Sequence, residues 1–354
     1  MTCSKPFRLL HLPSLAHDVI FSLMAIGDLY HLSKCSTRSR YVVKTFTRCQ
    51  TYSFKIDADM SRYRLRIWCD DGKKTFHHVL RPMDYRTAVD GRKLVTYCED
   101  YWATTKEEIL YLLDVFTREV NYLHFDDATK VIETTEFLKR ATHSPVECVY
   151  LFDEEPTIDD EVYKYILKEF KNTKKLKISA CPSSGFRFDE MEPFTGNSIG
   201  IDIADWMTVD HLVRCFPNAE KMCLYMDAKR CLITPQLMPQ FFNAWRHGSR
   251  MRDLELECDW RNTEFQVMFE NVPKTVVKRV EVKSKKLAFK EGRCFLIRQE
   301  ESGVEAIAYR CYDMLYFTTD FRLLRDDESD GDNHDSDDDF IDDVPWNSDS
   351  DEDF

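Results

Sequence analysis

The chain has 354 residues, 43% of them apolar, so it is long enough to bury a core and to hold two or three structural units. It has no cleavable secretion signal and no run of about 18 apolar residues, which predicts a soluble protein of the cytoplasm or nucleus. The net charge is −13, but fifteen acidic residues and no Lys or Arg lie in 326–354, so the rest is nearly neutral and neither nucleic acid nor a membrane is an expected partner.

The segment "LPSLAHDVIFSLMAIGDLYHLSKCS", from Leu12 to Ser36, is apolar with a broken helical spacing. One predicted face holds Val19, Ile20, Leu23 and Met24, and a second holds Leu29, Leu32 and Ser33 after an interruption at Gly27 and Asp28. We expect two or three short helices, which are too small for a large core of their own. They either pack on the following sheet or are completed by another protein.

Residues 51–102 alternate apolar and polar positions around "CDDGKK" and "VDGRK", which predicts two β-hairpins with Asp-Gly turns. Short strand signals then alternate with helix signals. Equivalent positions on the predicted strands are Leu123, Val149, Leu176, Ile201, Met222, Leu254 and Val280. Their spacing lies near the leucine-rich-repeat period of about 20 to 29 residues, so we predict a leucine-rich-repeat-like α/β solenoid over 120–325.

Three of the intervening segments are typical of amphipathic helices. The first is expected to begin at Thr105, with an apolar stripe ending at Val120, and the second to begin at Thr157. The third has Thr234 as its cap and Gly248 as its stop, and its predicted inward positions are Leu237, Met238, Phe241 and Trp245. Leu287 to Phe317 again reads as strand, turn and strand, so small β regions should flank the solenoid.

Residues 7–44, "FRLLHLPSLAHDVIFSLMAIGDLYHLSKCSTRSRYVVK", resemble the F-box in their Leu-Pro pair, their helical apolar positions and the run "IGDLYHLSKCSTRSR". The block "LITPQLMPQFFNAWRHGSRMRDLELECD" is similar to part of the F-box-associated domain of the large nematode group of F-box proteins, and "FLIRQEESGVEAIAY" to its late paired strands. The chain departs from the F-box pattern at Ser14, where an acidic residue is usual, and at Gly27.

The resemblance implies a substrate receptor of a cullin-RING, SCF-type ubiquitin ligase, with the adaptor subunit and through it cullin as partners and a target protein held by the C-terminal region. The residues that the resemblance implies for adaptor binding are Leu12, Pro13, Val19, Leu23, Asp28, Leu29, Leu32 and Ser33. Pro13, Leu29 and Leu32 are the expected anchors. Together the patterns and the resemblance predict four regions: an F-box-like helical domain at 1–50, a connecting region with hairpins and the first repeat helix at 51–119, a repeat-like F-box-associated domain at 120–325 and a disordered acidic tail at 326–354.

Two further segments are candidates for binding or regulation. The segment "ACPSSGFRFDEMEPFTGNS" is long for a repeat connection, and its Phe186, Phe188 and Phe194 either contact the target or fasten the segment to the body. The acidic tail is predicted to be disordered. Four serines of the tail each have an acidic residue three positions further on, which is typical of phosphorylation sites for acidophilic kinases: Ser329, Ser336, Ser348 and Ser350.

The sequence contains none of several common metal-binding, phosphate-binding or catalytic motifs. The thirteen cysteines include no C-x-x-C pair, and there is no H-E-x-x-H, no Gly-rich phosphate loop and no G-x-S-x-G. We therefore expect reduced thiols, no metal, no cofactor and no catalytic residues. Two alternatives to the receptor remain open, namely an interaction scaffold that does not bind the adaptor, and a protein that binds basic partners through its acidic tail.

Overall fold

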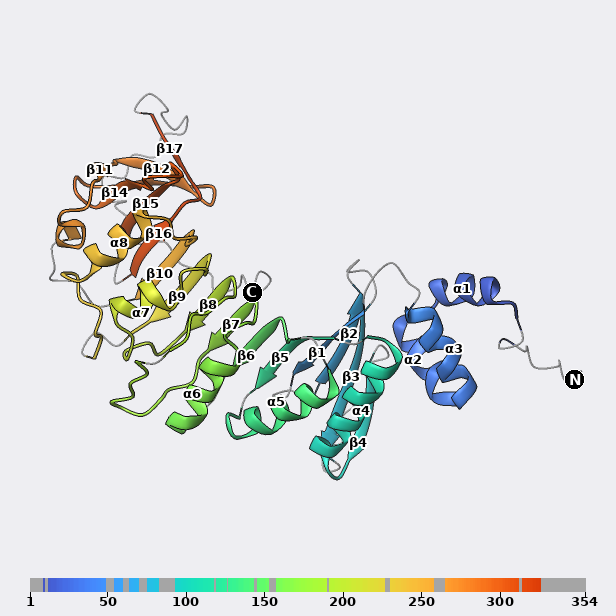
Figure 1. The fold of residues 1–354 in the computed structure, drawn as a ribbon. Helices are drawn as coiled ribbons and strands as arrows, with labels where there is room; N and C mark the ends of the chain where they lie inside the picture. Colours follow the sequence, from blue (N-terminus) through green and yellow to red (C-terminus); the bar gives the residue numbers. More distant parts are fainter. Residues whose placement is uncertain are drawn as a thin grey trace, which may run out of the picture. The chain divides into compact units, whose positions relative to one another are not determined.

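The computed structural model describes most of the chain between Leu9 and Arg325 (Figure 1). The described residues are 9, 12–48, 54–59, 64–69, 75–82, 93–117, 119–125, 127–142, 145–152, 157–189, 191–226, 230–257, 265–311 and 314–325. The chain divides into two compact units, Met1–Ile166 and Leu167–Phe354, and the division falls inside a helix. The acidic tail and its four serines lie outside the described residues.

Three short helices open the first unit: α1 (Ser14–Leu23), α2 (Ile26–Cys35) and α3 (Thr37–Arg48). The expectation of two or three helices is confirmed, but their boundaries differ from the prediction. Ala25 and Ser36 are extended, so Gly27 and Asp28 lie in the first turn of α2 instead of interrupting a helix. Ser36 and Ser39 cap α3 reciprocally, each backbone N–H donating to the other hydroxyl at 2.9 and 3.1 Å.

The sheet of the first unit has the strand order β6-β5-β1-β2-β3-β4. Its strands are β1 (Phe54–Asp59), β2 (Arg64–Cys69), β3 (Thr75–Pro82), β4 (Lys93–Cys98), β5 (Val120–Phe125) and β6 (Cys148–Leu151). Strands β2 and β3 pair antiparallel, as the first predicted hairpin requires. Strands β3 and β4 pair parallel, so the second predicted hairpin is wrong: a turn signal does not decide which strand pairs with which. Strands β1, β5 and β6 are parallel neighbours.

Helices α4 (Tyr101–Val115) and α5 (Thr129–Ala141) lie on one face of this sheet (Figure 1). Helix α4 begins earlier than predicted because the Asp100 carboxylate accepts from the backbone N–H of Ala103 at 2.9 Å, while Thr105 is buried inside the helix. Val120 belongs to β5 and not to the helix stripe. Helix α6 (Asp160–Glu169) is capped by Asp159, which accepts from Glu161 N at 2.8 Å.

The second unit has the strand order β7-β8-β9-β10-β16-β15-β14-β11. Its strands are β7 (Lys175–Ile178), β8 (Ser198–Ile201), β9 (Lys221–Tyr225), β10 (Asp253–Glu257), β11 (Thr275–Val276), β14 (Cys294–Arg298), β15 (Glu305–Cys311) and β16 (Met314–Thr318). The first four are parallel and the others antiparallel. Leu176 pairs with Ile199 and Ile199 with Met222, so Ile199, not Ile201, is the equivalent position.

Helices α7 (Val209–Arg214) and α8 (Met238–Arg246) and the 3-10 helix η2 (Phe265–Phe269) pack on this sheet. Met238, Phe241 and Trp245 are buried as predicted, whereas Leu237 is partly exposed because it precedes the helix. Gly248 follows the helix with φ of +124°, a conformation that favours glycine. In the loop before β8, a Cβ on Gly196 would lie 1.8 Å from the Thr173 carbonyl oxygen, so only glycine fits there.

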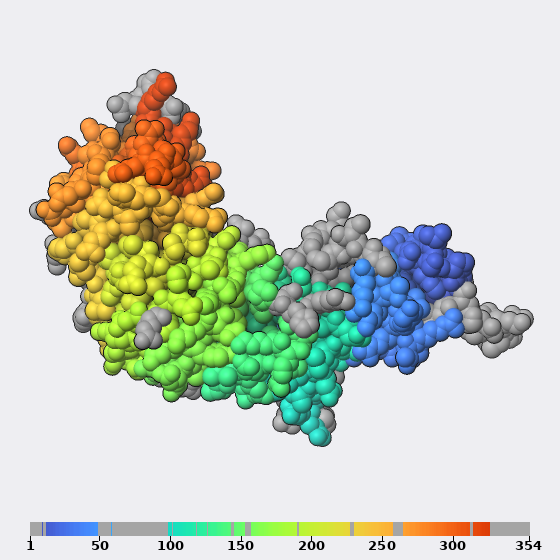
Figure 2. All heavy atoms as spheres, in the orientation of Figure 1, coloured from blue at the N-terminus to red at the C-terminus, as the bar shows by residue number. Residues whose placement is uncertain are grey.

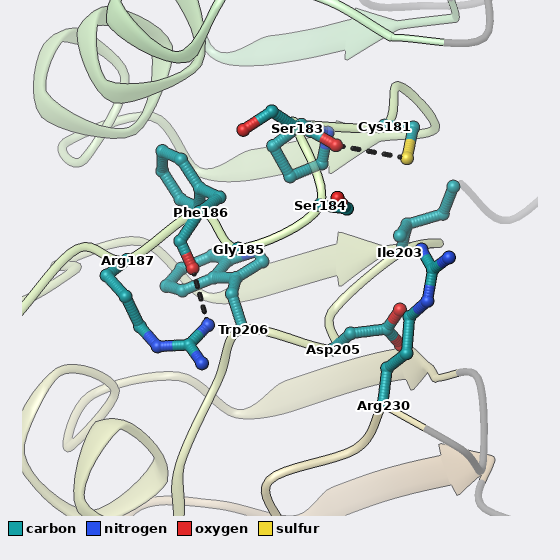
Figure 3. A pocket seen from close by; sticks show the side chains of 11 residues that line it. Cys181, Ser183, Ser184, Gly185, Phe186, Arg187, Ile203, Asp205, Trp206 and Arg230 are labelled. Carbon is teal, nitrogen blue, oxygen red and sulfur yellow. Dashed lines mark hydrogen bonds between the residues drawn. The ribbon is translucent and has the colours of Figure 1, made fainter.

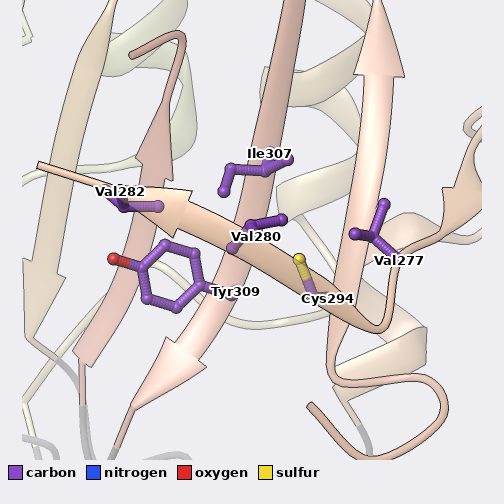
Figure 4. Packing of buried hydrophobic residues seen from close by; sticks show 6 residues of the cluster. All are labelled: Val277, Val280, Val282, Cys294, Ile307 and Tyr309. Carbon is purple, nitrogen blue, oxygen red and sulfur yellow. The ribbon is translucent and has the colours of Figure 1, made fainter. Parts of the chain in front are cut away.

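A small separate sheet has the order β13-β12-β17, with β12 (Arg279–Val282), β13 (Lys285–Ala288) and β17 (Phe321–Leu323) all antiparallel. The prediction that Val280 is an equivalent position of the repeat is therefore wrong. Val280 and Val282 instead pack against Cys294, Ile307 and Tyr309 (Figure 4). The structure thus shows a mixed α/β fold with N-terminal helices and a large mixed sheet, and the predicted β character of 287–317 is confirmed.

Candidate partner-binding surfaces

Helix α1 exposes a stripe of large apolar side chains. Leu15, Val19 and Leu23 are 78, 63 and 82% exposed, and their spacing of four residues places them on one side of the helix. The atoms of α1, dark blue in Figure 2, lie at the surface beside those of α2 and α3. We call these three residues the α1 stripe. Large apolar side chains gathered in this way are typical of a protein contact.

The opposite side of α1 holds the helix on the chain. Phe21 is fully buried, and its ring meets the Phe46 ring of α3 edge to face, with the centroids 5.4 Å apart. His17 stacks on Phe21 at 5.5 Å and its Nε2 lies 2.9 Å from the Leu9 carbonyl oxygen. The α1 stripe is therefore presented by a helix that is anchored by its other face.

Helix α2 is fastened to α4 by polar groups that are largely shielded from water. The Tyr30 hydroxyl donates to Glu108 Oε2 at 2.9 Å, and Lys34 Nζ lies 2.8 Å from the other carboxylate oxygen. The Ser33 hydroxyl donates to the Tyr30 carbonyl at 2.6 Å and lies 2.7 Å from the Tyr111 hydroxyl. Burial and the adjacent Glu108 carboxylate raise the pKa of Tyr30, so its hydroxyl remains a donor at neutral pH.

Helix α3 is fastened to α4 at Asp114. Arg40 donates to Asp114 Oδ2 through Nε at 3.1 Å and Nη2 at 2.8 Å, and Lys44 pairs with Oδ1. Burial opposes ionisation of Asp114, but the hydrogen bonds from Lys44 and Arg40 outweigh it and hold the pKa of the carboxyl below its ordinary value. Thr47 also donates to the Val115 carbonyl at 2.6 Å. Polar contacts therefore fasten α2 and α3 to α4, and α1 packs on α3 through Phe21 and Phe46.

The structure separates the predicted adaptor-binding residues into two groups. Exposed or half-buried are Leu12, Pro13, Val19, Leu23, Asp28 and Leu32. Leu29 and Ser33 are each 2% exposed, so Leu29 cannot serve as an exposed anchor, because its side chain already packs inside the chain. Leu15 was not among the predicted residues. Its position four residues before Val19 is the signal that identifies it.

A cavity of about 400 Å³ lies in the second unit beyond the carboxyl ends of three neighbouring parallel strands (Figure 3). Cys181 to Arg187 follow β7, Ile203 to Trp206 follow β8, and Arg230 follows β9. The carboxyl ends of parallel strands are a usual place for ligands in α/β sheets, because the loops that leave the strands converge there. The volume suits a few side chains of a bound segment.

The cavity combines an aromatic wall with a polar rim. Phe186 and Trp206 are both 3% exposed and meet edge to face at 5.3 Å. Arg187 and Arg230 are exposed at the rim with Asp205 half-buried between the loops, and Arg187 donates to the Phe186 carbonyl at 2.8 Å. Burial raises the pKa of the Cys181 thiol, so it is not an activated thiolate. Such a wall and rim can hold an apolar side chain and bind charged groups beside it.

The three phenylalanines predicted to contact a target differ in their surroundings. Phe186 lines the cavity, whereas Phe188 and Phe194 are 5% and 0% exposed and fasten the segment to the fold. The Phe188 carbonyl lies 3.1 Å from His211 Nε2, and the Phe194 ring packs on Phe216 at 6.2 Å. The burial of Phe188 and Phe194 therefore fits the second interpretation, in which they fasten the segment to the fold. Sequence spacing alone missed Asp205 and Arg230, which other loops bring to the same place.

No group of three or more His, Cys, Asp or Glu residues that could hold a metal occurs in the described part of the chain. No helix in that part is long and apolar enough to cross a membrane. Four of the cysteines with described side chains are buried: Cys98, Cys215, Cys223 and Cys294.

Comparison with known proteins adds one relative. The chain is similar to the Skn-1 dependent zygotic transcript 15 protein of Caenorhabditis elegans. The two sequences are 24% identical over 282 residues, which cover 71% of this chain and 79% of that protein. No family model and no solved structure match the chain. The similarity therefore gives the chain a nematode relative, and the F-box resemblance stays a prediction.

Proposed function

We propose that this chain is the substrate-recognition subunit of an SCF-type cullin-RING ubiquitin ligase. In this proposal α1 to α3 form an F-box that docks on the adaptor subunit and through it on cullin, in the cytoplasm or nucleus. The parallel strands and their helices form a leucine-rich-repeat-like solenoid, as in the F-box-associated domain that the sequence resembles, and this domain binds the target. The proposed subunit has no catalytic residues and no cofactor of its own.

The observation that carries the proposal is the α1 stripe. A helix anchored by Phe21 that exposes Leu15, Val19 and Leu23 on its other side has the form of an amphipathic helix made for a groove on another protein. This pattern coincides in sequence with the segment that resembles the F-box. Val19 and Leu23 belong to both sets, and the structure adds that their side chains are exposed.

The cavity between the loops after β7, β8 and β9 is the proposed place of target binding. It lies in the second unit, whereas the adaptor-binding helices lie in the first, so the two proposed surfaces do not compete for the same residues. Phe186 and Trp206 would hold an apolar side chain of the target, and Arg187 and Arg230 would select acidic groups next to it.

The test is a calorimetric titration of purified adaptor into the full chain. The stripe variant changes Leu15, Val19 and Leu23 to Ala. The matched control changes two other exposed apolar residues to Ala, Leu110 on α4 and Ile132 on α5. Burying a Leu or Val side chain is worth about 1.5 to 3 kcal/mol, so the stripe variant should weaken binding by about 100-fold or more. The control should bind as the wild type does.

The exposed positions make this variant informative. Their truncation should leave the free energy of unfolding nearly unchanged, whereas Leu29→Ala would cost about 2 to 5 kcal/mol and confuse unfolding with loss of contact. Absence of binding by the wild type, or equal binding by the stripe variant, would contradict the proposal. The scaffold alternative would then be favoured.

A further inference from the structure

The small sheet β13-β12-β17 has one apolar face and one basic face. Its apolar face, with Val280 and Val282, covers Ile307 and Tyr309 of the large sheet (Figure 4). Side chains alternate along a strand, so Arg279 and Glu281 of β12 project to the side opposite Val280 and Val282. On that side Arg279 pairs with Ala288, and Glu281 lies between Lys286 of β13 and Arg322 of β17. We call this second side the basic face.

The charge around the basic face is strongly unbalanced. Residues 278–293 and 320–325 contain nine Lys or Arg and three Asp or Glu. One acidic residue, Glu281, lies within the face and pairs with Arg322 at 2.8 Å. Lys286 is exposed on this face, and Lys278, Lys290 and Arg325 are exposed beside it. A cluster of this kind produces a positive potential that attracts an acidic ligand.

The chain itself supplies an acidic segment at this place. Strand β17 belongs to the small sheet, and after it Leu324 N donates to the Arg279 carbonyl at 3.3 Å, so the chain is still beside β12 one residue before Arg325. Residues 326–354 follow directly, with fifteen Asp or Glu and no Lys or Arg. Twenty-nine residues can span up to about 95 Å, far more than the roughly 13 Å of a four-residue strand.

We propose that the acidic segment 326–354 binds in cis to the basic face of the small sheet. The charges are complementary, and the covalent tether gives the segment an effective concentration of the order of millimolar at the face. Single exposed ion pairs contribute little, so many pairs must act together and the contact depends on ionic strength. The occupied face would be closed to other acidic ligands, and the segment would be withheld from basic proteins.

Phosphorylation is the expected control of this contact. The acidic serines of the segment, Ser329, Ser336, Ser348 and Ser350, would each add close to two negative charges. Added charge strengthens binding to the basic face and so holds the segment more firmly in place. This inference does not depend on the proposed ligase function.

A zero-length carbodiimide, which joins carboxylates to lysine amines in direct contact, tests the proposal on the full chain. Tail carboxylates should link to Lys286 and Lys290 and not to Lys168 or Lys174 of the same unit. The links should vanish in about 0.5 M salt, where the Debye length falls to a few ångströms. In a mixture of isotopically light and heavy protein, each link should join two peptides of the same isotope, because the contact is within one molecule.

The decisive variant reverses two charges of the basic face and leaves every lysine in place. Arg279→Glu with Arg322→Glu should reduce the links by about tenfold, because two attractive contacts become repulsive. Arg214→Glu with Arg250→Glu, exposed elsewhere in the unit, should leave them unchanged. If the first pair prevents folding, Arg279→Gln with Arg322→Gln replaces it, with a smaller reduction expected. Links spread evenly over all lysines, links between isotopes, or links insensitive to the charge change would overturn the proposal.

Discussion

The contact between Tyr30 and Glu108 should determine how firmly the N-terminal helices are held on the fold. The change to make is Tyr30→Phe, which removes the hydroxyl that donates to Glu108 Oε2 at 2.9 Å and keeps the ring. Tyr30 is 3% exposed and the Glu108 side chain 15%, so water replaces the lost partner poorly. Hydrogen bonds to charged groups contribute about 1.5 to 3 kcal/mol, and the remaining Lys34 pair places this one near the lower end.

A loss of about 1.5 kcal/mol corresponds to roughly a tenfold increase in the population of the open helices. Hydrogen exchange followed by mass spectrometry measures this locally, in peptides that cover α2 and α3. We expect exchange there to accelerate about tenfold where local opening limits it, with no change in peptides from the second unit.

The matched control is Tyr165→Phe. Tyr165 also donates its hydroxyl to a carboxylate, Glu136 Oε1 at 3.1 Å, but the Glu136 side chain is 52% exposed. Water can replace that bond, so the expected cost is below about 0.5 kcal/mol. Equal effects of the two substitutions, or faster exchange everywhere after Tyr30→Phe, would refute the conclusion that shielding gives the Tyr30 contact its strength.

Three further changes test other parts of the fold. Gly196→Ala should cost about 2 kcal/mol or more by chemical denaturation. Gly200→Ala should cost less than about 1 kcal/mol, because its Cβ would come no closer than 3.4 Å to any neighbour, and that nearest neighbour is the flexible side chain of Lys177. Burial raises the pKa of Cys223 to about 12, so at pH 8 an alkylating reagent should modify it far more slowly than the exposed Cys35, as peptide mapping would show. Folding lowers the pKa of Asp114, so the ionised carboxyl stabilises the fold above about pH 4. This stabilisation is lost as the pH falls through the pKa of Asp114 in the folded state. Asp114→Asn should therefore destabilise by about 0.5 to 1 kcal/mol at pH 7 and converge with the wild type in acid.

The sequence identified individual strands better than it identified which strands pair with one another. Alternating apolar residues located β5 to β10, because a half-buried strand must alternate. The same alternation occurs around Val280, where the strand joins a different sheet, since periodicity does not say which neighbour a strand pairs with. Likewise, "SIGID" offers two apolar positions two residues apart, and only pairing selects Ile199 over Ile201.

The candidate surfaces show the same limit. Helix α1 is apolar on two sides, and sequence alone does not distinguish the side buried by Phe21 from the side exposed at Leu15. The cavity combines residues from three loops, and their proximity follows from strand order. Only the segment containing Phe186 carried a signal of its own, in its length and its aromatic residues.

The way β10 is paired restricts how this fold can change in length. One edge of β10 pairs parallel with β9 and the other pairs antiparallel with β16, whose chain continues into the small sheet. A further strand and helix unit therefore cannot be appended after β10 without breaking an existing ladder. Related chains with more or fewer units should gain or lose them before β10, as internal insertions or deletions, while the C-terminal block from β10 to β17 is inherited as a whole.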